Sequence, residues 1–272
     1  MITSATFLIA LPALCAGEDP PGRTDTPAGP AAGERMERAA ADLRDAWFLI
    51  EKGSRVMGYH RIQVARSPDG SLLVQDEMAL LPSSGRISLR SEVTTGPNPL
   101  DPKRVRCETR QGPGQGSITM KGSIEFGAGE LRLVQEVFVD GLGNLLETPR
   151  AEKGSLKRPQ GPILIQALVP LLLAAAAEGE DGSDFGKVTV AEIPVDVGRL
   201  LALKEGRSLE VEAASGGVRK VFIRSGKERS GATIIRCSKP GAIARIEMED
   251  FTERRADPKD VRKAMPDLFA AK

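Results

Sequence analysis

The sequence contains one histidine, His60, and no other side chain has an ordinary pKa so close to neutrality. A metal centre built from several histidines is therefore excluded, and any nucleophile activated by a histidine would have to use this one. His60 falls in the apolar phase of an alternating run with Gly58, Ile62 and Val64, and no Gly-x-Ser-x-Gly or P-loop motif is present. We therefore expect a partly buried histidine hydrogen-bonded to a neighbour, or a packing residue at a strand edge, with a catalytic base as the alternative.

Two further patterns could carry chemistry. The adjacent carboxylates of Asp76 and Glu77 would point to opposite faces of a strand, so they cannot act on one substrate as an acid and base pair. The run at residues 112–117 (GPGQGS) has the composition of a phosphate-binding loop, but it lies between two expected strands and no helix follows it. We interpret it as a hairpin loop, and we expect no catalytic residue, no metal site and no cofactor.

Cys107 and Cys237 both fall in the inward phase of expected strands that are far apart in the sequence. In an oxidising compartment such a pair can form a disulfide, but free cysteine also packs well in a core as a small apolar residue. We expect two buried free thiols, with the disulfide as the alternative.

Alternation of apolar and polar residues with a period of two predicts strands over most of the chain. Gly, Pro and Asp turns separate these short strands, which favours an antiparallel meander because parallel neighbours require long crossover connections. Short helices are expected at residues 34–45 and after Asp257-Pro258, an N-cap followed by proline at the first helical position, with a helical turn at residues 200–204. The expected strands are residues 46–51, 56–64, 71–81, 86–94, 104–110, 117–126, 130–139, 187–193, 208–213, 218–225, 231–238 and 242–251.

Residues 163–177 are apolar except for Gln166 and Pro170, which predicts a buried helix that Pro170 kinks or splits. A helix of this length would measure about 22 Å, which is short of a membrane span. Such a helix can fill a core or line a cavity for a lipid-like ligand, and the small residues at 174–177 would leave room beside a sheet. The candidate cavity-lining residues are Ile163, Ile165, Leu168, Leu172, Ala174 and Ala175.

The first seventeen residues are typical of a secretory signal, with an apolar core at residues 7–14 and small residues before Glu18. Lipidation of Cys15 is the alternative, although the large Leu14 that precedes it is unfavourable for that modification. Residues 18–33 are rich in Pro, Gly and Ala and are expected to be disordered. We divide the chain into a signal peptide (1–17), a linker with a short helix (18–44), an antiparallel β domain (45–255) and a C-terminal helix and tail (256–272).

The charge composition argues against nucleic acid as a partner. The chain has 38 Lys and Arg against 37 Asp and Glu, so no net field attracts a polyanion. Aromatic residues make up 4% of the chain, too few for a surface on which bases stack. No integral membrane span is expected, and the oligomeric state is left open.

The order of elements resembles periplasmic proteins of the LolA/LolB-like group and the related DUF3108-type domains. The resemblance rests on an opening strand with Trp47, the glycine Gly53, the Gly58-Tyr59-His60 step, the apolar helical stretch, and a closing hairpin at residues 237–245 (CSKPGAIAR). It implies a curved antiparallel half-barrel that encloses an apolar helix, with short terminal helices. Its best-known members carry lipoprotein acyl chains in that concavity.

These observations predict a mainly β, exported protein that is periplasmic or extracellular and is not an enzyme. The expected function is binding of an apolar ligand or a lipidated partner, such as a lipid or a lipoprotein. The alternative is a structural or interaction module of the cell envelope with a filled core and no ligand.

Overall fold

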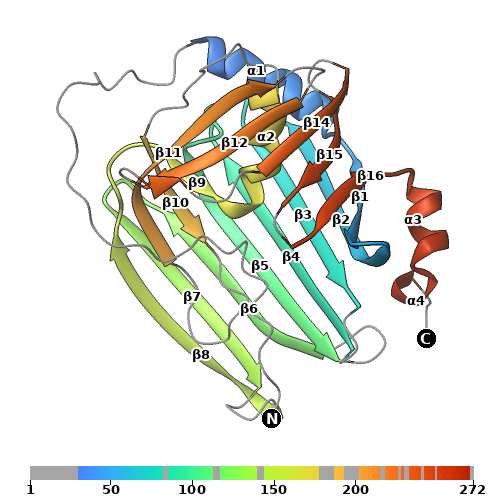
Figure 1. Ribbon diagram of the computed structural model, residues 1–272. Coiled ribbons are helices and arrows are strands. Elements are labelled where there is room, and N and C mark those ends of the chain that lie inside the picture. Colours follow the sequence, from blue (N-terminus) through green and yellow to red (C-terminus); the bar gives the residue numbers. More distant parts are fainter. Residues whose placement is uncertain are drawn as a thin grey trace.

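The structure, a computed structural model, describes residues 30–81, 85–112, 117–139, 144–177, 187–192, 202–214, 218–225, 228–229, 233–239, 242–248 and 250–269. Strands dominate this part of the chain, and Figure 1 shows them side by side in one large sheet. The protein is therefore mainly β, as the period-two alternation predicts.

Eight strands follow one another in chain order, and each pairs antiparallel with the next. Gly53 and Gly70, both with positive φ, lie in the first two turns, where a residue with a Cβ would be strained. The bounds are β1 Ala46–Lys52, β2 Arg55–Arg66, β3 Leu72–Leu80, β4 Arg86–Thr95, β5 Pro102–Gly112, β6 Ser117–Phe126, β7 Glu130–Val139 and β8 Leu145–Lys157.

The later strands extend the same sheet from β1, because the last strand, β16, pairs antiparallel with β1. The order then runs β16-β15-β14-β12-β11-β10-β9, with β13 paired to β12. Only β9 and β10 pair in parallel among the described strands. The two ends of this order, β8 and β9, are not paired with each other, so the described sheet is open. The bounds are β9 Ile163–Ile165, β10 Lys187–Glu192, β11 Ala202–Ala214, β12 Val218–Ser225, β13 Glu228–Arg229, β14 Thr233–Lys239, β15 Ala242–Glu247 and β16 Thr252–Arg255.

The described residues also form four α-helices and one 3-10 helix: α1 Pro30–Asp42, η1 Gln166–Leu168, α2 Val169–Ala177, α3 Pro258–Ala264 and α4 Pro266–Phe269. The α3 helix begins as predicted, because the Asp257 carboxylate accepts a hydrogen bond from the Lys259 backbone N–H and Pro258 occupies the first turn. None of the described helices combines the length and the apolar character that a membrane span requires.

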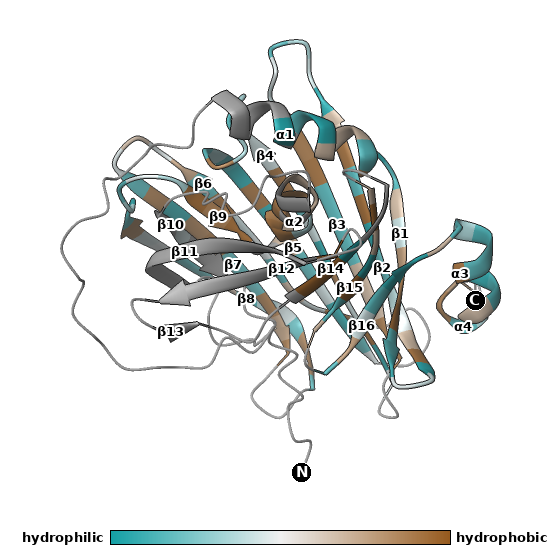
Figure 2. Cartoon of the chain, turned by 45° about the horizontal axis from the view of Figure 1, so that its top comes forward, coloured by the Kyte–Doolittle hydropathy of each residue, from teal (hydrophilic) through white to brown (hydrophobic). Residues whose placement is uncertain are grey.

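The sheet separates two apolar clusters. On the inner face, Phe48, Ile62 and Val74 belong to the large cluster that also contains the buried residues of α2. On the outer face, Trp47, Tyr59 and neighbouring residues pack against Val261, Met265 and Leu268 of the C-terminal helices. Figure 1 shows α3 and α4 beside β1 and β16, and Figure 2 shows α2 over the strands of the other face. Both faces of β1 and β2 are therefore packed against apolar side chains.

The prediction of one helix over residues 163–177 is wrong in its first half. Ile163–Ile165 forms β9, η1 follows, and α2 begins only at Val169. Pro170 explains the boundary, since proline is tolerated in the first turn of a helix but in the interior would clash with the carbonyl four residues earlier. The proline therefore marks where the helix begins.

The strand β8 was not predicted. It forms the edge of the sheet, and all but one of its residues are exposed, so its sequence (LLETPRAEKGSLK) shows no alternation of buried and exposed positions. Pro149 lies within it, and an edge strand is where a proline can be accommodated in a sheet. A strand without a buried face has no periodic signal to detect.

Three other boundaries differ from the expectations. The helical turn expected at residues 200–204 is wrong from Ala202 onward, where β11 begins. Residues 242–251, expected as one strand, form β15 and the approach to β16, because the Met248 backbone N–H donates to the Phe251 carbonyl in a turn. The α1 helix begins at Pro30, so the end of the expected disordered linker is helical. The predicted signal peptide and Cys15 lie outside the described residues.

Candidate functional site

His60 is buried on the inner face, with a carboxylate on each side of its ring. Its Nδ1 lies 3.0 Å from Glu253 Oε2, and its Nε2 lies 3.1 Å from Asp76 Oδ2. The three residues come from β2, β16 and β3, and each is less than a tenth exposed. The Phe48 ring lies next to the imidazole, with 6.1 Å between the ring centroids. The expectation of a histidine hydrogen-bonded to a neighbour is confirmed, and its burial is more complete than expected.

The two carboxylates determine the charge of the ring. Burial by itself lowers the pKa of His60, but the nearby negative charges of Glu253 and Asp76 and the hydrogen bonds to both outweigh it, so the pKa is raised well above the ordinary 6.5. The imidazolium can donate from both nitrogens at once, which satisfies both carboxylates. The cluster therefore contains two acidic side chains and one basic side chain.

This geometry leaves the imidazole with no nitrogen to act on a substrate. A general base needs a nitrogen within hydrogen-bonding reach of the proton it removes, and both nitrogens of His60 are bonded to carboxylates. No group of three His, Cys, Asp or Glu residues in the described part of the chain has the geometry of a metal site. What the cluster does is join the C-terminal strand β16 to β2 and β3 across β1.

A row of polar side chains continues from Asp76 across the inner face. Asp76 pairs in register with Ser91, Ser91 with Cys107, Cys107 with Gly122, and Gly122 with Gln135. The side chains of this polar row (Asp76, Ser91, Cys107 and Gln135) are between 4% and 8% exposed. Buried polar groups require hydrogen-bond partners, so a row of four such side chains, on β3, β4, β5 and β7, is unusual for a simple core.

Thr109 lies on the same inner face, two residues along β5 from Cys107. It is 1% exposed, and its Oγ1 has no hydrogen-bond partner among the described residues. Cys107 donates weakly to the Gly122 carbonyl at 3.8 Å, and burial raises the pKa of its thiol to about 11. Cys107 is a free buried thiol, as expected, whereas the side chain of Cys237 in β14 lies outside the described residues.

The neighbouring register row is entirely apolar and lies on the α2 side of the polar row. This apolar row consists of Val64, Val74, Val93, Val105, Ile124 and Leu133. On the other side of the polar row, Met78, Leu89 and Ile87 are only half-buried. On β3 and β4, the inner face therefore changes from apolar and buried, through polar and buried, to apolar and partly open to solvent, whereas Thr109, Met120 and Val137 beyond the polar row on β5–β7 are buried.

The predicted cavity-lining residues lie at the buried end of this gradient. The structure brings all six into the large inner cluster, where each is 0% or 1% exposed: Ile163 and Ile165 on β9, Leu168 in η1, and Leu172, Ala174 and Ala175 on α2. The η1 segment packs against β3, β4 and β10, while α2 packs against α1, β12, β14 and β15. In this structure, neighbouring elements therefore shield all six side chains from solvent.

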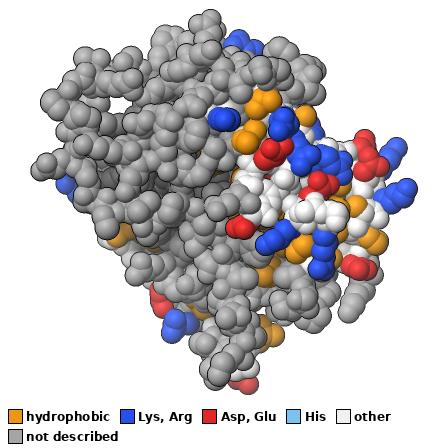
Figure 3. Space-filling view, viewed as in Figure 1, with side chains coloured by type: hydrophobic (Ala, Val, Ile, Leu, Met, Phe, Trp, Pro, Cys, Tyr) orange, Lys and Arg blue, Asp and Glu red, His pale blue; other side chains and the backbone are white. Residues whose placement is uncertain are grey.

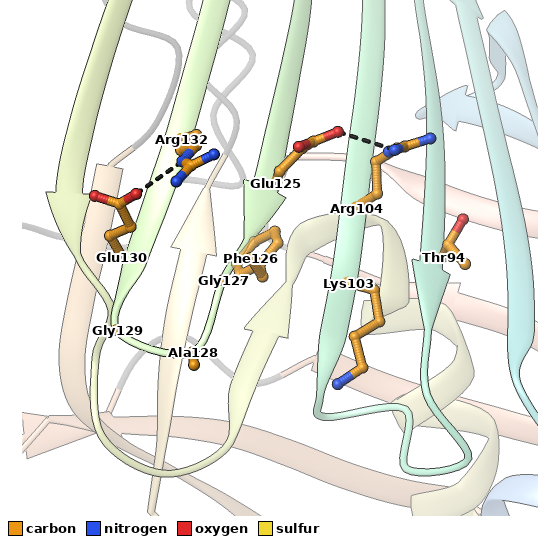
Figure 4. Close-up of a pocket in the computed structure, with 10 residues that line it drawn as sticks. All are labelled: Thr94, Lys103, Arg104, Glu125, Phe126, Gly127, Ala128, Gly129, Glu130 and Arg132. Atoms are coloured by element: carbon orange, nitrogen blue, oxygen red, sulfur yellow. Dashed lines mark hydrogen bonds and ion pairs between the residues drawn. The ribbon is translucent and has the colours of Figure 1, made fainter.

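The outer surface of the sheet offers paired charges. Figure 4 shows a depression beside the turn between β6 and β7, where Arg104 is 2.9 Å from Glu125 and Arg132 is 2.7 Å from Glu130. On the described part of the face in Figure 3, cationic and anionic side chains are also intermixed. Both patterns indicate the solvated side of a sheet, so the inner face remains the candidate site.

Sequence reasoning missed the partners of His60. The expectation that Asp76 and Glu77 point to opposite faces is confirmed, since Asp76 contacts His60 and Glu77 accepts a hydrogen bond from Tyr59. The alternation of the strand requires one of these two carboxylates to lie on the same face as His60, and this was the signal in the sequence for a carboxylate partner. Glu253 could not be found in this way, because its approach depends on the pairing of β16 with β1.

No protein-family model matches the chain, and a search of curated proteins found no match. Among solved structures, the chain is similar to a beta-barrel-like protein of domain of unknown function DUF1849 from Brucella abortus, with 12% sequence identity and a TM-score of 0.40 over 78% of this chain and 93% of that one. The class that the structure itself defines is a mainly β protein with one large, open and almost wholly antiparallel sheet.

Proposed function

We propose that this protein is a non-enzymatic binding protein for an apolar ligand or a lipidated partner, and that the ligand occupies the inner face of the sheet. The observation that carries the proposal is the continuous apolar cluster formed by the apolar row and the six residues of β9, η1 and α2. Apolar surface of this extent binds acyl chains without directional contacts. The LolA/LolB-like element order supports the same function, with the sheet as a half-barrel around the apolar helix.

Because the six residues are covered, a ligand must displace the η1–α2 segment or share its space. Three features make α2 suited to such an exchange. It has nine residues, all of them apolar, and four of these are alanines that each contribute little buried area. The ligand would replace the apolar contacts that α2 makes in the structure.

The absence of enzymatic activity belongs to the proposal as well. It is supported by the engagement of both His60 nitrogens with carboxylates, which leaves the chain's one imidazole without a free proton acceptor. Export by the segment at residues 1–17 is proposed from the sequence. An intact mass of the secreted protein that corresponds to a first residue between 16 and 18 would support it.

A second candidate is the structural or interaction module with a filled core. The observation that favours it is the 0% or 1% exposure of all six predicted lining residues, which leaves no surface for a ligand in this conformation. Native packing density throughout the inner face is what a scaffold requires.

Binding of N-phenyl-1-naphthylamine, an uncharged apolar dye whose fluorescence rises in apolar surroundings, separates the two candidates. The binding proposal expects a saturable rise in the wild type. It also expects Ala175→Asp to weaken binding while the β signal in circular dichroism is retained, because α2 can leave the cluster. Ala41→Asp, on the exposed side of α1, is the matched control and should change neither property. No dye binding in the wild type, together with loss of folding in Ala175→Asp, would support the filled-core module.

A further inference from the structure

We infer that the ligand of the inner face is an amphiphile with an uncharged, hydroxyl-bearing head, and that this head contacts the polar row and Thr109. The inference rests on the proposed function and specifies its ligand. Three observations carry it: the position of the polar row, the excess of acidic side chains beside it, and the hydroxyl of Thr109.

The position of the polar row matches the shape of an amphiphile. On β3 and β4, the polar row lies between the buried apolar row and the half-buried Met78, Leu89 and Ile87. On β5–β7, the corresponding positions are the buried Thr109, Met120 and Val137. Figure 1 shows α1 and α2 near the top of β2–β5, whereas β4 begins and β5 ends at the bottom. An acyl chain directed towards α2 would therefore place its head at the polar row, on the side from which solvent reaches the inner face.

The charge of the site excludes an anionic head. Asp76 and Glu253 are two acidic side chains beside the single imidazole of His60, so acidic groups outnumber basic ones at this end of the polar row. The other members of the row, Ser91, Cys107 and Gln135, are uncharged. A carboxylate or phosphate placed here would be desolvated beside like charge, and none of the described side chains of the polar row is a cation that could balance it. Hydroxyl groups can both donate to and accept from this set of side chains.

Thr109 supplies a group that lacks a partner inside the protein. Its hydroxyl is almost fully buried without a hydrogen bond among the described residues, which is energetically unfavourable unless a ligand supplies the partner. By contrast, the nearby Thr119 hydroxyl donates to the Thr109 carbonyl at 3.2 Å and is satisfied within the fold. The two threonines therefore form a matched pair, one free to bind a head group and one structural.

Competition with bound N-phenyl-1-naphthylamine tests the inference. The competitors are 1-monooleoylglycerol and oleate, which share one acyl chain and differ in the head, each used below its aggregation concentration. We expect 1-monooleoylglycerol to displace the dye at a concentration about tenfold lower than oleate does. Equal potency, or stronger displacement by oleate, overturns the inference but leaves the proposed function standing.

Thr109→Val then tests the hydroxyl directly. Because valine has the same shape without the oxygen, the variant should lose about fivefold in affinity for 1-monooleoylglycerol while its affinity for the dye and its urea midpoint are not reduced. The control Thr119→Val should lower the urea midpoint and leave the preference between the two heads unchanged. Unchanged affinity of Thr109→Val for 1-monooleoylglycerol contradicts the inference. Failure of the wild type to bind dye or competitor overturns both the inference and the proposed function.

Discussion

The strands β2 and β3 carry two polar clusters back to back, and the clusters differ in how they are satisfied. On the inner face, His60 bonds to Asp76 and Glu253, and all three residues are buried. On the outer face, Tyr59 donates to Glu77 at 2.6 Å, and Glu77 also accepts a hydrogen bond from the exposed Arg90 at 3.0 Å. Tyr59 and His60 are adjacent in sequence, as are Asp76 and Glu77. They nevertheless form one cluster that is buried from solvent and one that is partly exposed to it.

The difference in burial determines how much stability is lost when one member of each cluster is removed. In the buried cluster, loss of one member leaves charge without water or counter-charge, and such a loss is strongly destabilising. In the outer cluster, Glu77 keeps Arg90 and partial solvent contact when Tyr59 changes, so the loss approaches that of one hydrogen bond. Four predictions test this contrast.

The largest effect is expected for His60→Ala at neutral pH. Removal of the imidazole leaves Asp76 and Glu253 buried without a partner, so the free energy of unfolding should fall by about 3–5 kcal/mol, measured by urea denaturation. Replacement of all three residues by leucine should restore much of that loss, because no buried charge remains. A loss below 1 kcal/mol for His60→Ala would show that the cluster is not dry.

Gly58→Ala is expected to be the next most harmful change. A Cβ at Gly58 would clash with the Ala79 carbonyl oxygen, so β2 and β3 would have to separate beside His60. The free energy of unfolding should fall by about 2–3 kcal/mol, in the range of overpacking. Gly154→Ala on the edge strand β8 meets nothing within 4 Å and should be neutral or stabilising. Equal effects of the two substitutions in urea denaturation would contradict the close approach of β2 and β3.

The buried cluster also predicts how stability changes with pH. The folded pKa of His60 lies above the ordinary 6.5, so its contribution is complete below pH 6.5 and is lost as pH rises towards the folded pKa. The free energy of unfolding should therefore decrease above pH 6.5, by at most about 1.4 kcal/mol per pH unit. Urea denaturation between pH 6 and pH 8.5 measures it. His60→Ala should lack this decrease, and an equal slope in both proteins would show that another group is responsible.

The smallest effect is expected on the outer face. Tyr59→Phe removes the hydrogen bond to Glu77 but keeps the ring, which stacks on Phe269 with 5.0 Å between centroids. The free energy of unfolding should fall by about 1 kcal/mol, the value of one hydrogen bond. A loss as large as that of His60→Ala would remove the contrast between the two faces.

Much of this contrast was present in the sequence, and the rest required the topology. Alternation separated His60 from Tyr59 and Asp76 from Glu77, because neighbouring side chains of a strand point to opposite faces. Glu253 is 193 residues from His60, and only the pairing of β16 with β1 brings them together. The edge strand β8 lacked a buried face and left no periodic signal. The helix at residues 163–177 was predicted too long because apolar composition alone does not distinguish β9 from α2.

The central claim is that the inner face binds an amphiphile. Native mass spectrometry of the protein purified from the envelope of cells that produce it is the most direct test. We expect a population with an added mass that dissociates as an uncharged acyl lipid, and the same preparation of Ala175→Asp should carry much less of it. A single unliganded mass for the folded wild type, unchanged after incubation with 1-monooleoylglycerol, would contradict the claim and favour the filled-core module.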